Sequence, residues 1–123
     1  MNLFRVALCL SVLLPSLSKA DQVTYECKQA YGRADSNFNI KADTLRRVAD
    51  VVVVREGHQF LYGMEGGIDS PELHDNATPG FFSNVVGNVQ FAMVVEGSNI
   101  SFFMADRGQK VGVQAYDCTP KKQ

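Results

Sequence analysis

The second half of the chain has a clear alternation of apolar residues. From 89 to 96 every second residue is apolar, and the positions between them are mixed. A period of two is typical of a strand with one buried face. Turn-forming residues follow at 96–99 and 106–109, and an apolar segment resumes after each. The sequence therefore predicts an antiparallel meander with strands over 89–96, 100–105 and 110–118.

The first half of the chain is less regular. We expect further strands over 22–28, 38–42, 51–54, 59–64 and 81–86, of which the β-branched segment 51–54 is the clearest. Residues 31–37 are polar and predict a loop. Asp43 is placed to N-cap one helical turn over 44–48, although the same stretch also suits a continuing strand.

These segments give seven or eight short strands, spaced at intervals of about ten residues. Such spacing predicts an all-β fold: a small antiparallel up-and-down barrel, with a sandwich as the second choice. We expect one disulfide between the two ends of the chain to close this sheet.

The N-terminal residues have the features of an export signal. A basic residue, Arg5, precedes the apolar segment Val6–Leu14, which is too short to span a bilayer as a helix. Pro15 ends the segment, and Ser18 and Ala20 are the small residues that a signal peptidase reads. We expect residues 1–20 to be a signal peptide and 21–123 a single β domain. The domain would be periplasmic or extracellular, without a stable membrane anchor after cleavage; an uncleaved anchor is the alternative.

Cysteine usage and charge agree with this destination. Cys9 leaves with the signal, so the mature chain keeps Cys27 and Cys118, which we expect to form a disulfide. Closing so long a loop stabilises the folded state by about 4 kcal/mol. The net charge of the whole chain is −1, and removal of Arg5 and Lys19 makes it more negative. An acidic chain without a basic stripe argues against nucleic-acid binding.

The segment 65–80 stands apart because it is long, lacks periodicity and contains no lysine or arginine. Long loops in small domains are often functional, although a solvated connection is the simpler explanation. We take five of its residues as candidate partner-binding residues: Glu65, Asp69, Glu72, His74 and Asp75.

Metal binding and catalysis receive little support from this segment. Its acidic residues do not have the spacing of an EF-hand loop, and its histidine belongs to no His-Glu-x-x-His helix. The mature chain has only His58 and His74 as histidines, no Gly-x-Ser-x-Gly elbow and no free cysteine. We therefore expect no catalytic residues, no metal and no cofactor.

The leading hypothesis is a non-enzymatic binding module. It would be an inhibitor or immunity-type protein that acts on a basic envelope enzyme through its acidic loop, because opposite charges speed encounter. Tyr25-Glu26-Cys27 is similar to the Tyr-x-Cys of small periplasmic lysozyme inhibitors. Their Ser-Gly-x-x-Tyr loop is absent, so the sequence assigns no family.

The alternative hypothesis is a carrier of a small apolar ligand in the barrel interior, lined by Phe91, Met93, Phe102 and Met104. A narrow barrel is usually filled by its own side chains, which weighs against this hypothesis. Asn76 and Asn99 also begin glycosylation sequons, whose use depends on the host.

Overall fold

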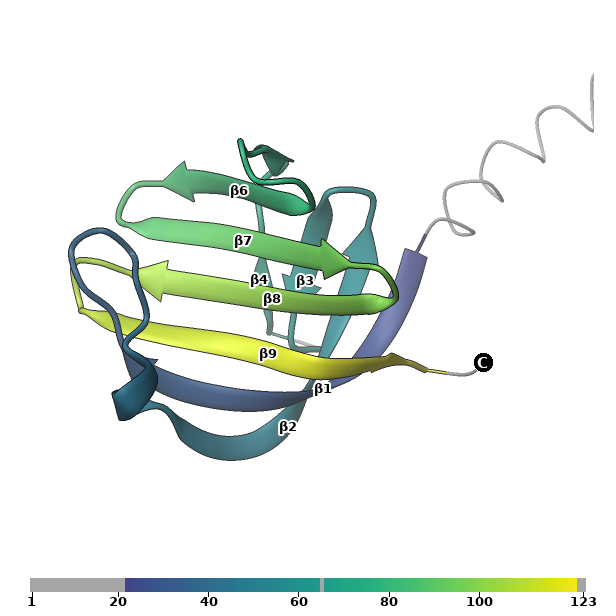
Figure 1. The fold of residues 1–123 in the computed structure, drawn as a ribbon. Helices are drawn as coiled ribbons and strands as arrows, with labels where there is room; N and C mark the ends of the chain where they lie inside the picture. The colour runs from purple at the N-terminus through teal and green to yellow at the C-terminus, as the bar shows by residue number, and fades with distance from the viewer. Residues whose placement is uncertain (1–21, 65, 122–123) are drawn as a thin grey trace, which may run out of the picture.

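The computed structural model of the protein describes residues 22–64 and 66–121 (Figure 1). The expected signal peptide, residues 1–20, lies outside the described residues. The described part contains one 3-10 turn, η1 (Ala42–Thr44), and nine strands. The strands are β1 (Gln22–Arg33), β2 (Arg46–Glu56), β3 (Gln59–Tyr62), β4 (Ile68–Asp69), β5 (His74–Asp75), β6 (Phe81–Val86), β7 (Val89–Glu96), β8 (Asn99–Asp106) and β9 (Val111–Pro120).

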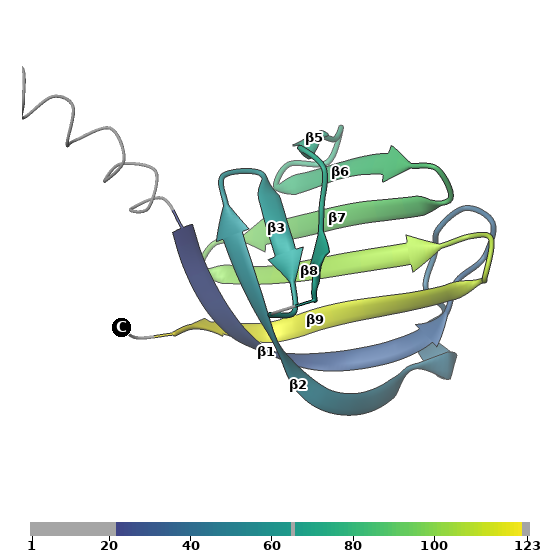
Figure 2. The ribbon, with the colours of Figure 1, turned by 180° about the vertical axis from the view of Figure 1, so that it is seen from behind.

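All nine strands form one antiparallel sheet in the order β4-β3-β2-β1-β9-β8-β7-β6-β5. The sheet curls into a half-barrel, with β1 and β9 as neighbours in its middle (Figures 1 and 2). The predicted all-β antiparallel fold is thus confirmed, in the form of an open curled sheet. The strand count exceeds the expected seven or eight because β4 and β5, of two residues each, lie inside the segment predicted as a loop.

The disulfide between Cys27 and Cys118 is confirmed, and it joins β1 to β9 across 91 positions of sequence. Both pairings of β1 shift their register beside Cys27. Asp117, next to Cys118, has a φ of 49°, which few side-chain-bearing residues adopt. Bulges of this kind bend strands and increase their twist. The sheet is therefore bent close to the point where the disulfide holds its first and last long strands together.

The concave face of the half-barrel carries the core. Phe102 is fully buried, and its ring centroid lies 5.0 Å from that of Phe60. Phe60 also contacts Phe91, at 6.3 Å between ring centroids. The four side chains that we expected to line an interior cavity are all buried members of this same core. Their own packing fills the centre of the half-barrel.

Two local predictions around η1 were wrong. The expected strand over 38–42 is a loop in which Phe38 has a φ of 65°, and the only ladder contact of this stretch is an isolated bridge between Ala34 and Ile40. The loop packs on the outer face instead, with Ile40 against Gly112, where a Cβ atom would lie 2.5 Å from Ile40 Cγ1. The second error is the cap, because Lys41 precedes η1 and Asp43 lies within it.

Hydrogen bonding to neighbouring strands explains where the strands actually begin and end. Tyr31, in a stretch predicted as loop, pairs with both Arg46 of β2 and Val113 of β9. The expected helical turn over 44–48 likewise gives way to β2 from Arg46 onward, as the alternative had allowed. Ladder bonds on both sides of β1 thus override the weak local preferences of these residues.

Candidate functional site

The acidic segment 65–80 connects strands at opposite edges of the sheet. Ile68–Asp69, as β4, pairs with β3, and His74–Asp75, as β5, pairs with β6. Because β4 and β5 are the two edge strands, the chain between them crosses the open side of the half-barrel (Figure 2). We call residues Ile68–Asp75 the closing segment.

The closing segment is anchored along most of its length, although within the predicted loop 65–80 only Ile68–Asp69 and His74–Asp75 are strands. The backbone N–H groups of Ser70 and Leu73 donate to the carbonyl oxygens of Phe60 and His58, each at 2.8 Å. Ser70 is buried, and its Oγ accepts the N–H of Phe60 at 2.9 Å. The Asn84 side chain, from β6, donates to the carbonyl of Glu72 at 2.9 Å. Leu73 is buried in the core and completes the attachment.

The predicted partner-binding residues Asp69, Glu72, His74 and Asp75 all have exposed side chains on this segment. Glu65, the fifth, lies outside the described residues. Among residues 22–64 and 66–121 the ion pairs are Lys28–Asp117 and Arg47–Asp50, so the acidic residues of the closing segment have no cationic partner there.

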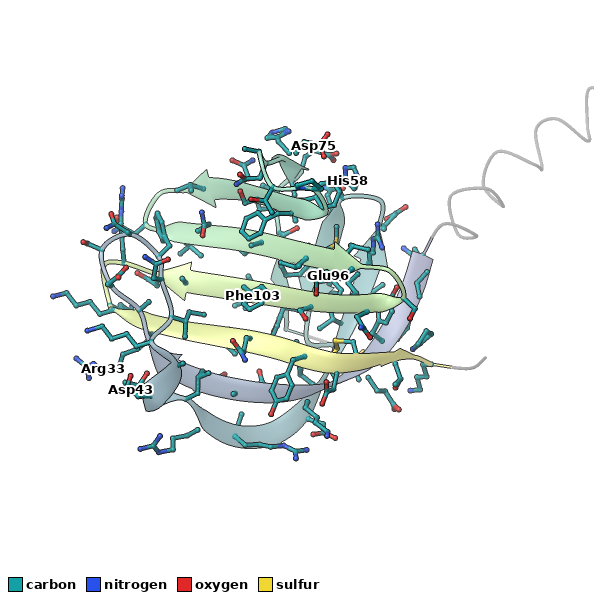
Figure 3. All side chains as sticks on the ribbon, in the orientation of Figure 1. Arg33, Asp43, His58, Asp75, Glu96 and Phe103 are labelled. Atoms are coloured by element: carbon teal, nitrogen blue, oxygen red, sulfur yellow. A yellow bond between two sulfur atoms is a disulfide. The ribbon has the colours of Figure 1, made fainter. Side chains whose placement is uncertain are left out.

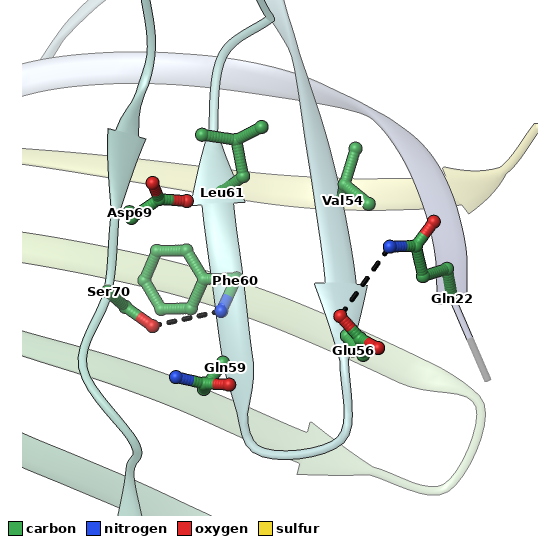
Figure 4. A pocket seen from close by; sticks show the side chains of 8 residues that line it. All are labelled: Gln22, Val54, Glu56, Gln59, Phe60, Leu61, Asp69 and Ser70. Atoms are coloured by element: carbon green, nitrogen blue, oxygen red, sulfur yellow. Dashed lines mark hydrogen bonds between the residues drawn. The ribbon is translucent and has the colours of Figure 1, made fainter. Parts of the chain in front are cut away.

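The outer face beside the closing segment has a polar hollow of about 430 Å³ (Figure 4). Asp69 and Glu56 both line this hollow, together with the amide side chains of Gln22 and Gln59. The amide of Gln22 donates to Glu56 Oε1 at 3.5 Å. Sequence reasoning missed Glu56, because only the pairing of β3 with both β2 and β4 brings this turn residue near Asp69.

A second hollow, apolar and of about 210 Å³, opens on the concave face. Viewed from behind in Figure 2, β3, β4 and β5 cover one part of β6–β9, and the part nearer the 106–111 turn has no strand in front of it. The hollow lies on this concave face, with Phe91 and Met104 in its lining. Tyr31, Ile68 and Val111 line it as well, although they are 53%, 52% and 47% exposed. We call this hollow the apolar cleft.

A buried polar pair lies next to the apolar cleft. Tyr62, the register partner of Ile68, donates its hydroxyl to Gln29 Oε1 at 3.0 Å. The amide of Gln29 in turn donates to the carbonyl of Ala49 at 2.8 Å. Burial raises the pKa of Tyr62 above its ordinary value, and the neighbouring phenol of Tyr31 raises it further. Tyr62 is therefore a neutral donor at physiological pH.

His58 and His74 do not come together into a reactive pair with an acid. The ring of His58 stacks on Phe82 at 4.3 Å between centroids, which gives it a packing contact near the end of the closing segment, where Phe82 pairs with Asp75 (Figure 3). Within residues 22–64 and 66–121, no three His, Cys, Asp or Glu side chains are grouped to hold a metal ion. In the same part of the chain, no helix has the length and apolar character needed to cross a bilayer.

The fold and these sites define a disulfide-closed, curled antiparallel half-barrel with an acidic closing segment and an apolar cleft. No family model, curated protein or solved structure matches this chain.

Proposed function

We propose that this protein is an exported, non-enzymatic binding module that docks on a cationic protein through its closing segment. The observation that carries the proposal is the outward presentation of Asp69, Glu72 and Asp75 without ion pairs in the described part of the chain. A cationic surface that faces these carboxylates gains charge pairs and breaks none.

The anchoring of the closing segment supports this role. A segment that is already ordered loses little conformational freedom when a partner binds it, so more of the contact energy appears as affinity. Hydrogen bonds to Phe60, His58 and Asn84 provide this order before binding. The hollow between Glu56 and Asp69 adds a place for a basic side chain of the partner beside the segment.

The partner class that fits best is a basic enzyme of the cell envelope, with the protein acting as its inhibitor or immunity partner. Cationic cell-wall hydrolases have the required charge. The expected export of the chain would bring the two proteins into the same compartment.

The test compares two triple variants that remove equal charge. D69N/E72Q/D75N alters the closing segment, and E26Q/D43N/E96Q alters exposed acidic residues elsewhere; Asp43 lies far from Asp75 in Figure 3. At low salt we expect the closing-segment variant to bind its envelope partner, and a purified cationic lysozyme used as the first probe, roughly tenfold more weakly. The control variant should retain its affinity, and moderate salt should reduce the difference.

Capture from an envelope extract identifies the partner, and titration calorimetry with the purified partner gives the affinities. Equal binding by both triple variants and the unmodified protein, at both salt concentrations, would remove the electrostatic basis of the proposal.

A further inference from the structure

The apolar cleft is a separate feature from the closing segment's acidic face. Its lining comes mainly from β7, β8 and β9, with Tyr31 from β1 at one side and Ile68 from β4. Three of its apolar side chains are about half exposed on one concave surface: Tyr31, Ile68 and Val111. Their exposure to water costs hydrophobic free energy, which a bound ligand would recover. Val86, also exposed, extends this surface, since it pairs with Val89 of the lining.

Cationic residues lie beside two lining residues of the cleft, Tyr31 and Val111. Arg33 is the register partner of Val111, and Arg46 is the register partner of Tyr31, so each lies on the same face of the sheet as a lining residue. Lys110 precedes Val111 and, with Arg33, lines an adjacent polar hollow of about 310 Å³. Figure 3 shows Arg33 at this end of the molecule.

These cations have no carboxylate ion partner within residues 22–64 and 66–121. Asp106 also lines the cleft, but its Oδ1 accepts hydrogen bonds from the backbone N–H groups of Gly108 and Gln109 at 2.8 and 3.0 Å. Its charge is therefore partly engaged in the β8–β9 turn. Arg46 Nη1 donates to the carbonyl oxygens of Asp43 and Leu45, at 3.4 and 2.8 Å, so part of its guanidinium is engaged as well. Arg33 makes no side-chain ion pair in the described residues and is the free cation beside Val111.

We propose that the apolar cleft binds a single-chain anionic amphiphile, a free medium-chain carboxylate, with its hydrocarbon chain on Phe91, Met104 and Val113 and its head group toward Arg33 and Arg46. The apolar walls recognise the chain, and the cations at the mouth recognise the carboxylate. This site is independent of the proposed protein-binding role.

The size and shape of the cleft select a free molecule over a bilayer. At about 210 Å³ the cleft is smaller than the pockets that hold drug-sized ligands, so it suits one short chain. It is also concave, whereas a surface that inserts into a membrane has to project its apolar side chains into the lipid.

The experiment uses titration calorimetry on the purified, disulfide-bonded protein with octanoate, octanol and octylammonium as probes. We expect saturable binding of octanoate, weaker binding of octanol by roughly tenfold, and the weakest binding by octylammonium. Methyl NMR spectra should show shifts at Ile68, Met104 and Val111 that saturate with octanoate. Vesicles of phosphatidylglycerol should not cosediment the protein.

Two pairs of substitutions separate chain recognition from charge recognition. I68Q/V111Q removes apolar lining, and V23Q/V85Q is its matched control at exposed apolar residues that do not line the cleft. We expect only the first to weaken octanoate binding, by about tenfold or more. R33Q/R46Q should weaken octanoate binding to the level of octanol and leave octanol binding unchanged. D69N/E72Q/D75N should leave octanoate binding intact, so this inference and the proposed function fail separately.

The proposal is overturned if octanoate binds without saturation. It is also overturned if I68Q/V111Q and its control V23Q/V85Q lose octanoate binding equally while NMR shows each to be folded. Tighter binding of octylammonium, or an R33Q/R46Q protein that still prefers octanoate to octanol, overturns the anionic head group. Cosedimentation with vesicles in the absence of octanoate binding overturns the free ligand.

Discussion

Single residues show how this small core accommodates polar groups. Inside the half-barrel, the hydroxyl of Tyr62 on β3 donates a hydrogen bond to the side-chain oxygen of Gln29 on β1. The side-chain nitrogen of Gln29 donates to the carbonyl of Ala49. No buried side-chain nitrogen or oxygen of the described residues lacks a hydrogen-bond partner. In so small a core, one unsatisfied group would consume a large part of the net stability.

Replacing Tyr62 with phenylalanine leaves Gln29 Oε1 without its donor. We expect the free energy of unfolding to fall by about 1–3 kcal/mol, measured by urea denaturation at pH 7. Tyr116→Phe is the control, because the Tyr116 hydroxyl has no side-chain hydrogen bond in the described residues. Equal losses in the two variants would show that the Tyr62–Gln29 bond contributes nothing specific.

The same tyrosine makes a prediction about alkaline pH. Burial raises the pKa of Tyr62 in the folded protein above its ordinary value of 10.0. The unfolded chain therefore loses this proton first, and stability that is complete below pH 10 is lost as the pH rises above 10. The slope contributed by this group is at most about 1.4 kcal/mol per pH unit. Tyr62→Phe should flatten the alkaline decline by that amount; an unchanged slope between pH 10 and 11 would contradict the assignment.

At the scale of the elements, the pairing of β1 with β9 organises the sheet. These strands lie far apart in sequence, yet they are neighbours in the sheet and carry the disulfide and both bulges.

Gly80, just before β6, lets the chain lie close to β7. Its φ is +78°, and a Cβ atom there would lie within 2.3 Å of the Val95 carbonyl oxygen, so glycine is required where β6 approaches β7.

Removing the disulfide in C27A/C118A should lower the free energy of unfolding by about 4 kcal/mol, because the unfolded chain regains the freedom of a long loop. The native sheet should persist where the remaining stability permits, since hydrogen bonds hold β1 to β9 independently of the sulfurs. Urea denaturation and amide exchange at β1 and β9 measure the two effects. A loss below about 1 kcal/mol would show that the disulfide contributes little to the stability of the fold that brings the two cysteines together.

At the scale of the whole molecule, the closing segment links the two edges of the open sheet. It pairs with β3 on one side and β6 on the other, so one short stretch covers the outer edges of both of these strands. The same stretch presents the acidic residues outward, while Ile68 at its start lines the apolar cleft. Residues 68–75 thus both hold the edges of the sheet and carry the proposed acidic docking surface.

Leu73→Ala tests this closure. Leu73 is 1% exposed, and its removal should cost about 2–5 kcal/mol and make residues 64–80 more sensitive to limited proteolysis. Leu61→Ala, on the partly exposed face of β3, should cost less and leave proteolysis unchanged. If the two variants are cleaved at the same rate, the closing segment does not depend on its buried leucine.

Local sequence patterns were sufficient to predict β6 and β7. The apolar segment 89–96 coincides with β7, and the segment 81–86 with β6, because the residues that favour each strand are consecutive in the sequence. The sequence also determined the disulfide, since Cys27 and Cys118 are the only cysteines left after the expected signal cleavage.

The positions of the two proposed recognition surfaces, in contrast, follow from contacts between distant segments of the chain. Ile68–Asp69 and His74–Asp75 are too short to show a period, and they become strands only because β3 and β6 supply hydrogen-bond partners. The apolar cleft likewise joins Tyr31, Ile68 and Val111, three residues whose neighbours in sequence do not reveal their proximity. Local preference acts over a few residues, whereas the curl of a sheet depends on contacts between residues far apart in the chain.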